Sequence, residues 1–231
     1  MAKRFPQVTK VIFDVDGLLL DTERLYLLAA LKVCSEYGKK YTRELKAKVM
    51  GKSEKEATRI VVDYLQLPIQ PEEYKEKVRA EHMKTFPSVA LLPGAETLVR
   101  HLHKHNIPMA VASGSSNWSY NLKTASHKEL FSLFSHAVLC GDDPDVKAGK
   151  PHPDCFLVAA RRFGDNPDVK EILIFEDAPN GVEAASAAGM PCVCVPGEWT
   201  DRSDVTAKST IVLDSLELFR PEDFGLPSYG S

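Results

Sequence analysis

The sequence predicts an α/β protein with a doubly wound parallel sheet and a helical subdomain inserted after the first strand. Two observations lead to this prediction. From residue 95 onward, short apolar runs of strand type alternate with segments of helical periodicity. Such alternation indicates parallel strands covered by helices on both faces. Between residues 21 and 92, by contrast, helical patterns follow one another without a convincing strand.

The first predicted strand ends in two carboxylates. Residues 11–13 are β-branched or aromatic, as expected of a strand buried on both faces. Asp14, Asp16 and Gly17 follow directly. Ligands of open α/β sheets bind outside the carboxyl ends of the strands, and paired carboxylates there suit a hard cation such as Mg²⁺. The alternative is an ordinary turn, because Asp and Gly are also common turn residues.

The helical stretch that follows is interpreted as a cap. Ser53 and Glu56 form a capping-box pattern, and apolar residues at helical spacing come after it. The chain would cross between cap and core at residues 17–21 and 92–94, and these crossings could act as a hinge. The predicted division is a Rossmann-like core from residues 1–20 and 93–231 and a helical cap from residues 21–92.

The remaining strands are expected after the cap. The apolar runs that predict them lie at residues 107–112, 136–140, 172–175, 192–195 and 211–213. Helices fit between these runs, notably at residues 154–163 and 181–188. The second of these helices is rich in alanine, with Gly189 as its stop signal, so we expect it to lie close to the sheet.

Three further strand ends carry groups suited to phosphate or a cation. Ser113 and Gly114 offer a hydroxyl and backbone N–H groups, which can bind phosphate oxygens. Lys150 offers an ammonium group, and Glu176 with Asp177 could complete a metal site. Taken singly, each could be a turn residue, a solvated lysine or the start of a helix. Together they converge, because the carboxyl ends of parallel strands share one edge.

Composition and charge exclude several classes of protein. The chain is 44% apolar with a net charge of −3 and a pI near 6.2, so nothing favours nucleic acid or a membrane as partner. The first ten residues show no apolar signal segment, and no run of 18 apolar residues occurs, so we expect a cytoplasmic protein. The five cysteines lack metal-type spacing, and we expect free thiols. We also expect a monomer.

The strand-end motifs together resemble those of the haloacid dehalogenase-like hydrolases. They occur in that family's order, as Asp14-Val15-Asp16-Gly17, Ser113, Lys150-Pro151 and Glu176-Asp177. The helical insert is similar to the cap of the β-phosphoglucomutase-like subgroup. The longer sequence segments at residues 12–23, 175–185 and 224–229 resemble those of the animal pseudouridine-5'-phosphatases.

The resemblance implies phosphoryl transfer through an aspartyl phosphate. Asp14 would attack phosphorus, which divides one difficult hydrolysis into two displacements. Asp16 would protonate the leaving alcohol and then take a proton from water. Lys150, Ser113 and the Gly114 amide would bind the oxygens of the transferring phosphoryl group.

The resemblance also implies a bound Mg²⁺ ion. Its ligands would be a carboxylate oxygen of Asp14, the backbone carbonyl of Asp16 and a carboxylate oxygen of Asp177. Glu176 would orient a water on the metal rather than bind the metal directly.

A small-molecule phosphomonoester is the implied partner, with selection by the cap. Gly51 and Lys52 are candidate substrate-binding residues, although Lys52 could equally flank a helix in solvent. The animal family implies pseudouridine 5'-phosphate as the substrate. The alternative is a phosphatase or mutase acting on a sugar phosphate.

Other functions fit the motifs less well. Tyr26 stands where the β-phosphoglucomutase pattern has a histidine, which favours hydrolysis over a mutase reaction. Asp16 disfavours a dehalogenase, whose reaction has no leaving alcohol to protonate. A catalytically silent binding protein would be expected to have lost one of the motif residues, and none is missing.

Overall fold

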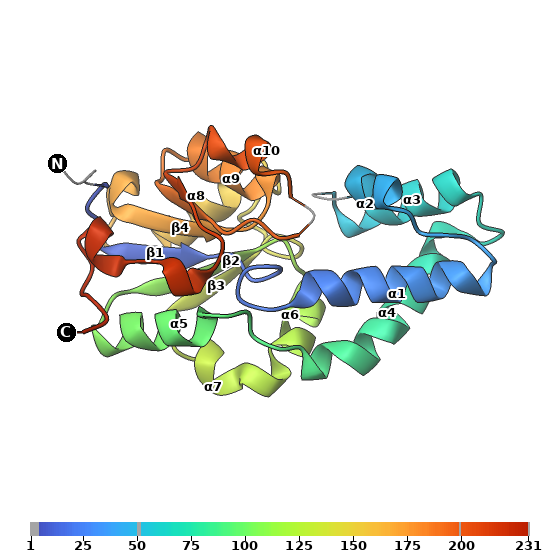
Figure 1. Cartoon of the computed structure of the whole chain (residues 1–231), viewed down its shortest axis with the longest axis horizontal. Helices are drawn as coiled ribbons and strands as arrows, with labels where there is room; N and C mark the ends of the chain where they lie inside the picture. Colours follow the sequence, from blue (N-terminus) through green and yellow to red (C-terminus); the bar gives the residue numbers. More distant parts are fainter. Residues whose placement is uncertain (1–4, 50–51, 199, 231) are drawn as a thin grey trace.

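Among the described residues, six parallel strands form one sheet with helices on both of its faces (Figure 1). The structure is a computed structural model that describes residues 5–49, 52–198 and 200–230. The strand order is β3-β2-β1-β4-β5-β6, so β1 lies between β2 and β4, with Phe13 in register with Val111 and Phe175. The strands are β1 (Lys10–Phe13), β2 (Met109–Ser113), β3 (His136–Leu139), β4 (Ile172–Glu176), β5 (Cys192–Cys194) and β6 (Ile211–Val212).

Helices cover both faces of this sheet, as predicted for a doubly wound fold. Every residue of β1, β2 and β4 is buried. Successive β1 side chains alternate between faces: Ile12 packs in the layer of α8 (Asp154–Arg161) and α9 (Pro179–Ala187), whereas Val11 and Phe13 pack in the layer of α5 (Ala95–Lys104). Each such apolar side chain stabilises the fold by roughly 1.5–3 kcal/mol. The continuous apolar runs seen in the sequence follow from burial on both faces.

The first four α-helices described after β1 lie to one side of the sheet (Figure 1). They have a hydrophobic core of their own, which includes Val33, Leu45 and Val61. Ser53 caps the third of them by accepting a hydrogen bond of 3.3 Å from the Glu56 backbone N–H. The helices are α1 (Thr22–Glu36), α2 (Arg43–Val49), α3 (Glu54–Leu65) and α4 (Pro71–Thr85). The division into core and cap stays a prediction.

The two chain crossings between sheet and helices lie side by side. The Asp21 N–H donates to the Ala90 carbonyl at 3.0 Å, and the Leu92 N–H donates to the Leu19 carbonyl at 2.9 Å. Backbone hydrogen bonds therefore join the segment that leaves the sheet to the segment that returns to it; a hinge at these crossings stays a prediction.

The remaining helical elements are short. They are α6 (Asn117–Lys123), α7 (Lys128–Phe131), α10 (Arg202–Thr206), η1 (Phe86–Ser88), η2 (Ala125–His127), η3 (Val169–Glu171), η4 (Leu216–Leu218) and η5 (Pro221–Phe224). Within the described ranges, no helix combines the length and apolar character needed to cross a membrane.

A disulfide joins Cys140 and Cys155, so the expectation of five free thiols is wrong for this pair. Cys140 follows β3 and Cys155 lies in the first turn of α8, with their Cα atoms 6.1 Å apart. The spacing along the chain gave no signal, because the pair forms only where α8 packs back against the sheet. Cys34, Cys192 and Cys194 are free and buried.

His82 of α4 is buried at the junction between the cap helices and η1. Its ring stacks on Phe86 with centroids 4.3 Å apart and meets the edge of Tyr26 at 5.0 Å. Its Nε2 atom has no hydrogen-bond partner among the described residues. Burial lowers the pKa of His82 to about 4, because the charged ring would lose its hydration.

This lowered pKa predicts acid sensitivity. A folded-state pKa below the unfolded value contributes stability above the unfolded pKa that is lost as pH falls through the folded pKa. We expect His82 to cost about 2–3 kcal/mol of folding free energy at pH 4.5 relative to neutral pH. Melting temperatures from pH 7 to 4.5 should therefore fall less in His82→Phe than in the wild type. His103 is exposed, so His103→Phe should show the same fall of melting temperature with pH as the wild type. An equal fall in all three proteins would contradict the prediction.

Candidate active site

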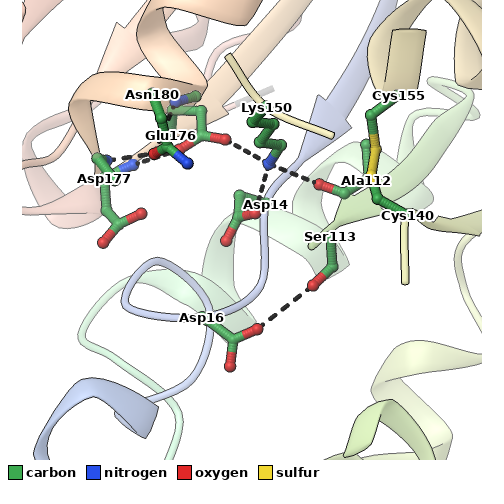
Figure 2. Close-up of polar contacts among 12 residues, drawn as sticks. Asp14, Asp16, Ala112, Ser113, Cys140, Lys150, Cys155, Glu176, Asp177 and Asn180 are labelled. Atoms are coloured by element: carbon green, nitrogen blue, oxygen red, sulfur yellow. Dashed lines mark hydrogen bonds and ion pairs between the residues drawn. A yellow bond between two sulfur atoms is a disulfide. The ribbon is translucent and has the colours of Figure 1, made fainter. Parts of the chain in front are cut away.

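The carboxyl edge of the sheet brings the predicted strand-end residues together (Figure 2). Asp14 comes directly after β1, Ser113 is the last residue of β2 and Glu176 is the last residue of β4. Lys150 reaches the same place from the loop between β3 and α8. The strand order places β1 at the centre, so its carboxylates face partners from both neighbouring strands.

Lys150 contacts several of these residues at once. Its Nζ atom donates to Asp14 Oδ1 at 2.6 Å and to the Ala112 carbonyl at 3.0 Å, and it also pairs with Glu176 Oε1 (Figure 2). Burial by itself would lower the pKa of this lysine, but the neighbouring carboxylates of Asp14 and Glu176 raise it above its usual value. Lys150 therefore holds a permanent positive charge against the oxygen of Asp14.

Three buried carboxyl groups lie near Lys150, and two of them, those of Asp14 and Glu176, pair with it. Asp14, Glu176 and Asp177 are 6%, 1% and 7% exposed. Burial raises the pKa of Asp14, raises the pKa of Glu176 to about 7 and, with the charges of Glu176 and Asp14, raises the pKa of Asp177 well above its usual range. The group is short of positive charge, which a bound cation would supply.

The backbone after Asp16 fits closely against Asp177. Gly17 has φ +79°, and a Cβ atom at this position would lie 2.3 Å from Asp177 Oδ2. A residue with a side chain would fill the space between the Asp16–Gly17 backbone and this carboxylate. The described residues hold no cluster of three or more His, Cys, Asp or Glu side chains arranged for a metal. Two carboxylates and one main-chain carbonyl, the set formed by Asp14, Asp177 and Asp16, fit a hard cation.

Glu176 is fixed by the start of α9. Its Oε2 accepts hydrogen bonds from the backbone N–H groups of Asp177 at 3.1 Å and Ala178 at 3.4 Å. A Cβ atom on Gly181 would lie 1.9 Å from the Glu176 Cδ atom. The alanine-rich helix thus approaches the sheet closely, as predicted, and a glycine makes room for the buried carboxylate.

Asp16 lies apart from the Lys150 group and has partners of its own. Its Oδ2 accepts hydrogen bonds from Ser115 Oγ at 3.0 Å and Ser113 Oγ at 3.3 Å, and it pairs with Lys123 Nζ. Its Oδ1 accepts from the Tyr26 hydroxyl of α1 at 3.4 Å. Although burial would raise the pKa of Asp16, the Lys123 charge outweighs it and lowers the pKa below its usual value.

Sequence reasoning missed Lys123 and Ser115 as members of this site. Lys123 ends α6 and is fully buried, ten residues beyond Ser113. The local sequence gives no sign that Lys123 is buried, because α6 has only seven residues and is too short to show an apolar stripe. The contact of Lys123 with Asp16 depends on how α6 packs against η1 and η2, and a single sequence does not report that packing.

The comparisons with known proteins agree with this geometry. A family model described as haloacid dehalogenase-like hydrolase matches residues 11–195. The chain belongs to this family. The resemblance inferred from the four motifs is confirmed, and so is the α/β fold class.

Relatives of this hydrolase act on several kinds of phosphate ester. A probable pseudouridine-5'-phosphatase of Drosophila melanogaster is 47% identical over 223 residues, covering 96% of each chain. A (DL)-glycerol-3-phosphatase of Arabidopsis thaliana is 46% identical over 225 residues, covering 96% of this chain and 93% of the relative. The crystal structure of a putative beta-phosphoglucomutase from Thermotoga maritima matches with a TM-score of 0.74 and 29% identity, over 94% of this chain and 97% of that one. The hydrolase is thus a phosphatase that acts on phosphorylated small molecules.

The remaining predicted substrate-binding residues are Gly114, Gly51 and Lys52. Gly114 follows Ser113 and is exposed, and the binding role of its amide stays a prediction. Lys52 is exposed and pairs with Glu56 at 3.1 Å, away from the motif residues among the residues that the structure describes. Gly51 lies outside the described residues. The binding role of Lys52 stays a prediction.

The close approach at Gly181 gives a testable prediction. Gly181→Ala should displace Glu176 or α9, lowering the free energy of unfolding by about 1–3 kcal/mol through overpacking and reducing phosphatase activity with it. Gly149→Ala is the control, because a Cβ there meets nothing within 4 Å. Chemical denaturation and p-nitrophenyl phosphate hydrolysis measure both effects. A Gly181→Ala protein as stable and active as Gly149→Ala would contradict the geometry.

Proposed function

We propose that this hydrolase requires Mg²⁺, forms an aspartyl phosphate on Asp14 and hydrolyses pseudouridine 5'-phosphate to pseudouridine and phosphate. The observation that carries the chemistry is the position of Asp14, a buried carboxylate at the end of the central strand whose Oδ1 lies 2.6 Å from Lys150 Nζ. The Drosophila relative supports the choice of substrate.

The two aspartates divide the reaction between them. A carboxylate oxygen of Asp14 attacks phosphorus, the bond from phosphorus to the leaving oxygen breaks, and Asp16 donates a proton to that oxygen. Water then attacks the phosphorus of the aspartyl phosphate, Asp16 takes its proton, and Asp14 is released with inorganic phosphate. Lys150 and Ser113 bind the phosphoryl oxygens as negative charge moves onto them.

Mg²⁺ would be held by Asp14, Asp177 and the Asp16 carbonyl. When bound, it offsets the repulsion between an anionic nucleophile and an anionic substrate. Glu176 acts through its contacts with Lys150 and with the backbone N–H of Asp177, fixing both the ammonium group and the strand end that carries the metal-binding carboxylate.

The face of the cap toward α6 supports a nucleotide as substrate. Arg79 of α4 lies over the ring of Trp118, 5.0 Å from its centroid, and forms two hydrogen bonds of 3.0 and 2.8 Å with Glu54. Trp118 is 39% exposed. Because Arg79 and Glu54 satisfy each other, the partly exposed ring of Trp118 is what this face offers to a base, as a surface for stacking.

Glycerol 3-phosphate is the second candidate substrate. The Arabidopsis glycerol-3-phosphatase is almost as similar to this chain as the Drosophila relative, at 46% against 47% identity. The motif residues contact only the phosphoryl group and the leaving oxygen, so they serve either substrate equally.

Asp14→Asn tests the mechanism. An amide is a poor nucleophile, so we expect the rate of phosphate release to fall by about 10³-fold or more with the melting temperature retained. Asp165→Asn is the control. Asp165 pairs at 2.6 Å with Lys10, at the opposite end of β1 from Asp14, so its loss should leave the rate unchanged. Activity close to wild type in Asp14→Asn would refute the aspartyl phosphate.

A substrate panel tests the specificity. Pseudouridine 5'-phosphate should be hydrolysed with a kcat/KM at least about tenfold above uridine 5'-phosphate, because the two bases present different ring N–H groups to hydrogen-bonding partners. Glycerol 3-phosphate, glucose 6-phosphate and β-glucose 1-phosphate complete the panel. If one of these three is the best substrate, or the two nucleotides are equal, the substrate assignment is wrong while the phosphatase reaction stands.

A further inference from the structure

Lys123 is a fully buried lysine next to the carboxylate of Asp16. Its side chain is 0% exposed, and its Nζ atom pairs with Asp16 Oδ2 and donates to Ser115 Oγ. An ammonium group is costly to bury unless it is paired and hydrogen-bonded. Two site residues meet that need here.

A second buried lysine shows what a structural ion pair looks like in this protein. Lys10, at the other end of β1, is 10% exposed and pairs with Asp165 at 2.6 Å, but Asp165 is 57% exposed and lies outside the site. The partner of Lys123 is 19% exposed and is the aspartate that follows the nucleophile. The two ion pairs therefore differ in the carboxylate that they orient. Lys10 pairs with a surface carboxylate, whereas Lys123 pairs with a carboxylate of the candidate active site.

The two oxygens of Asp16 face different parts of the molecule. Lys123, Ser113 and Ser115 all bind Oδ2 from the core, whereas Oδ1 is met by the Tyr26 hydroxyl of α1. In the proposed reaction, the leaving group of a substrate whose phosphate sits at the sheet edge would extend toward these helices. Oδ1 is therefore the oxygen on the side where a proton has to be delivered.

We propose that Lys123 is a positioning residue, which fixes Asp16 through Oδ2 so that Oδ1 reaches the leaving oxygen and then the attacking water. This role rests on the proposed function of Asp16 as acid and base. The proton that moves passes between Asp16 Oδ1, the leaving oxygen and water. Without the ammonium group only hydroxyl partners would orient the carboxylate, and a displacement of about 1 Å can cost a reaction on the order of 10²-fold.

The test compares two substrates of nearly the same shape. Phenyl phosphate has a poor leaving group that needs protonation, whereas p-nitrophenyl phosphate has a good one that needs little. In the full chain with Mg²⁺, Lys123→Met should lower kcat on phenyl phosphate by about 10²-fold and on p-nitrophenyl phosphate by less than about tenfold, with KM changed little. Asp16→Asn should show the same selective loss.

Lys10→Met is the matched control, because it removes a buried lysine and its ion pair far from the site. It should lose thermal stability while keeping the wild-type ratio of the two rates. Should Lys123→Met fail to fold, Lys123→Gln replaces it, since glutamine keeps an N–H donor but removes the charge, and the selective loss on phenyl phosphate is again expected.

An equal loss on both substrates, or no loss, overturns the positioning role. These outcomes are distinct from a failure of the proposed function. That failure would show as no Mg²⁺-dependent hydrolysis by the wild type, or as activity retained in Asp14→Asn.

Discussion

The ion pair between Lys150 and the carboxylates of Asp14 and Glu176 is the interaction on which the site depends. Removing charges from water costs several kcal/mol per ion, and mutual attraction repays this only with good geometry and further hydrogen bonds. Here the Ala112 carbonyl and the backbone N–H groups after Glu176 supply those hydrogen bonds. The central strand, its two neighbours and the β3–α8 loop must all be in register for the charges to remain buried. The fold therefore holds Asp14 buried and paired with Lys150 at the carboxyl end of β1.

Close backbone approach completes this arrangement. Gly17 lets the loop after Asp16 lie against the Asp177 carboxylate, and Gly181 lets α9 lie against Glu176. Both glycines stand where a methyl group would meet a carboxylate rather than an apolar side chain. The carboxylates can then converge from opposite sides without intervening bulk, which a small cation with oxygen ligands requires.

Asp16 connects this rigid core to the cap. One of its oxygens is held by core residues, and the other is met by Tyr26 from the first cap helix. Tyr26 also contacts His82, whose ring packs against Phe86 where the chain returns toward the sheet. Asp16 thus has partners both among the residues that follow β2 and on α1, so it links the strand ends to the helices that follow β1.

By itself the sequence determined the α/β class, the strands, the capped helix at Ser53 and the four motifs at the strand ends, because each depends on local periodicity, turn chemistry or a short run of residues. The convergence of Asp14, Lys150 and Glu176 also followed, since parallel strands share one carboxyl edge. The tertiary structure alone decided the pairing of Lys123 with Asp16, the Cys140–Cys155 disulfide and the surface position of Lys52. These contacts depend on how short helices and loops pack against the sheet, and that packing joins residues whose separation along the chain carries no periodic signal.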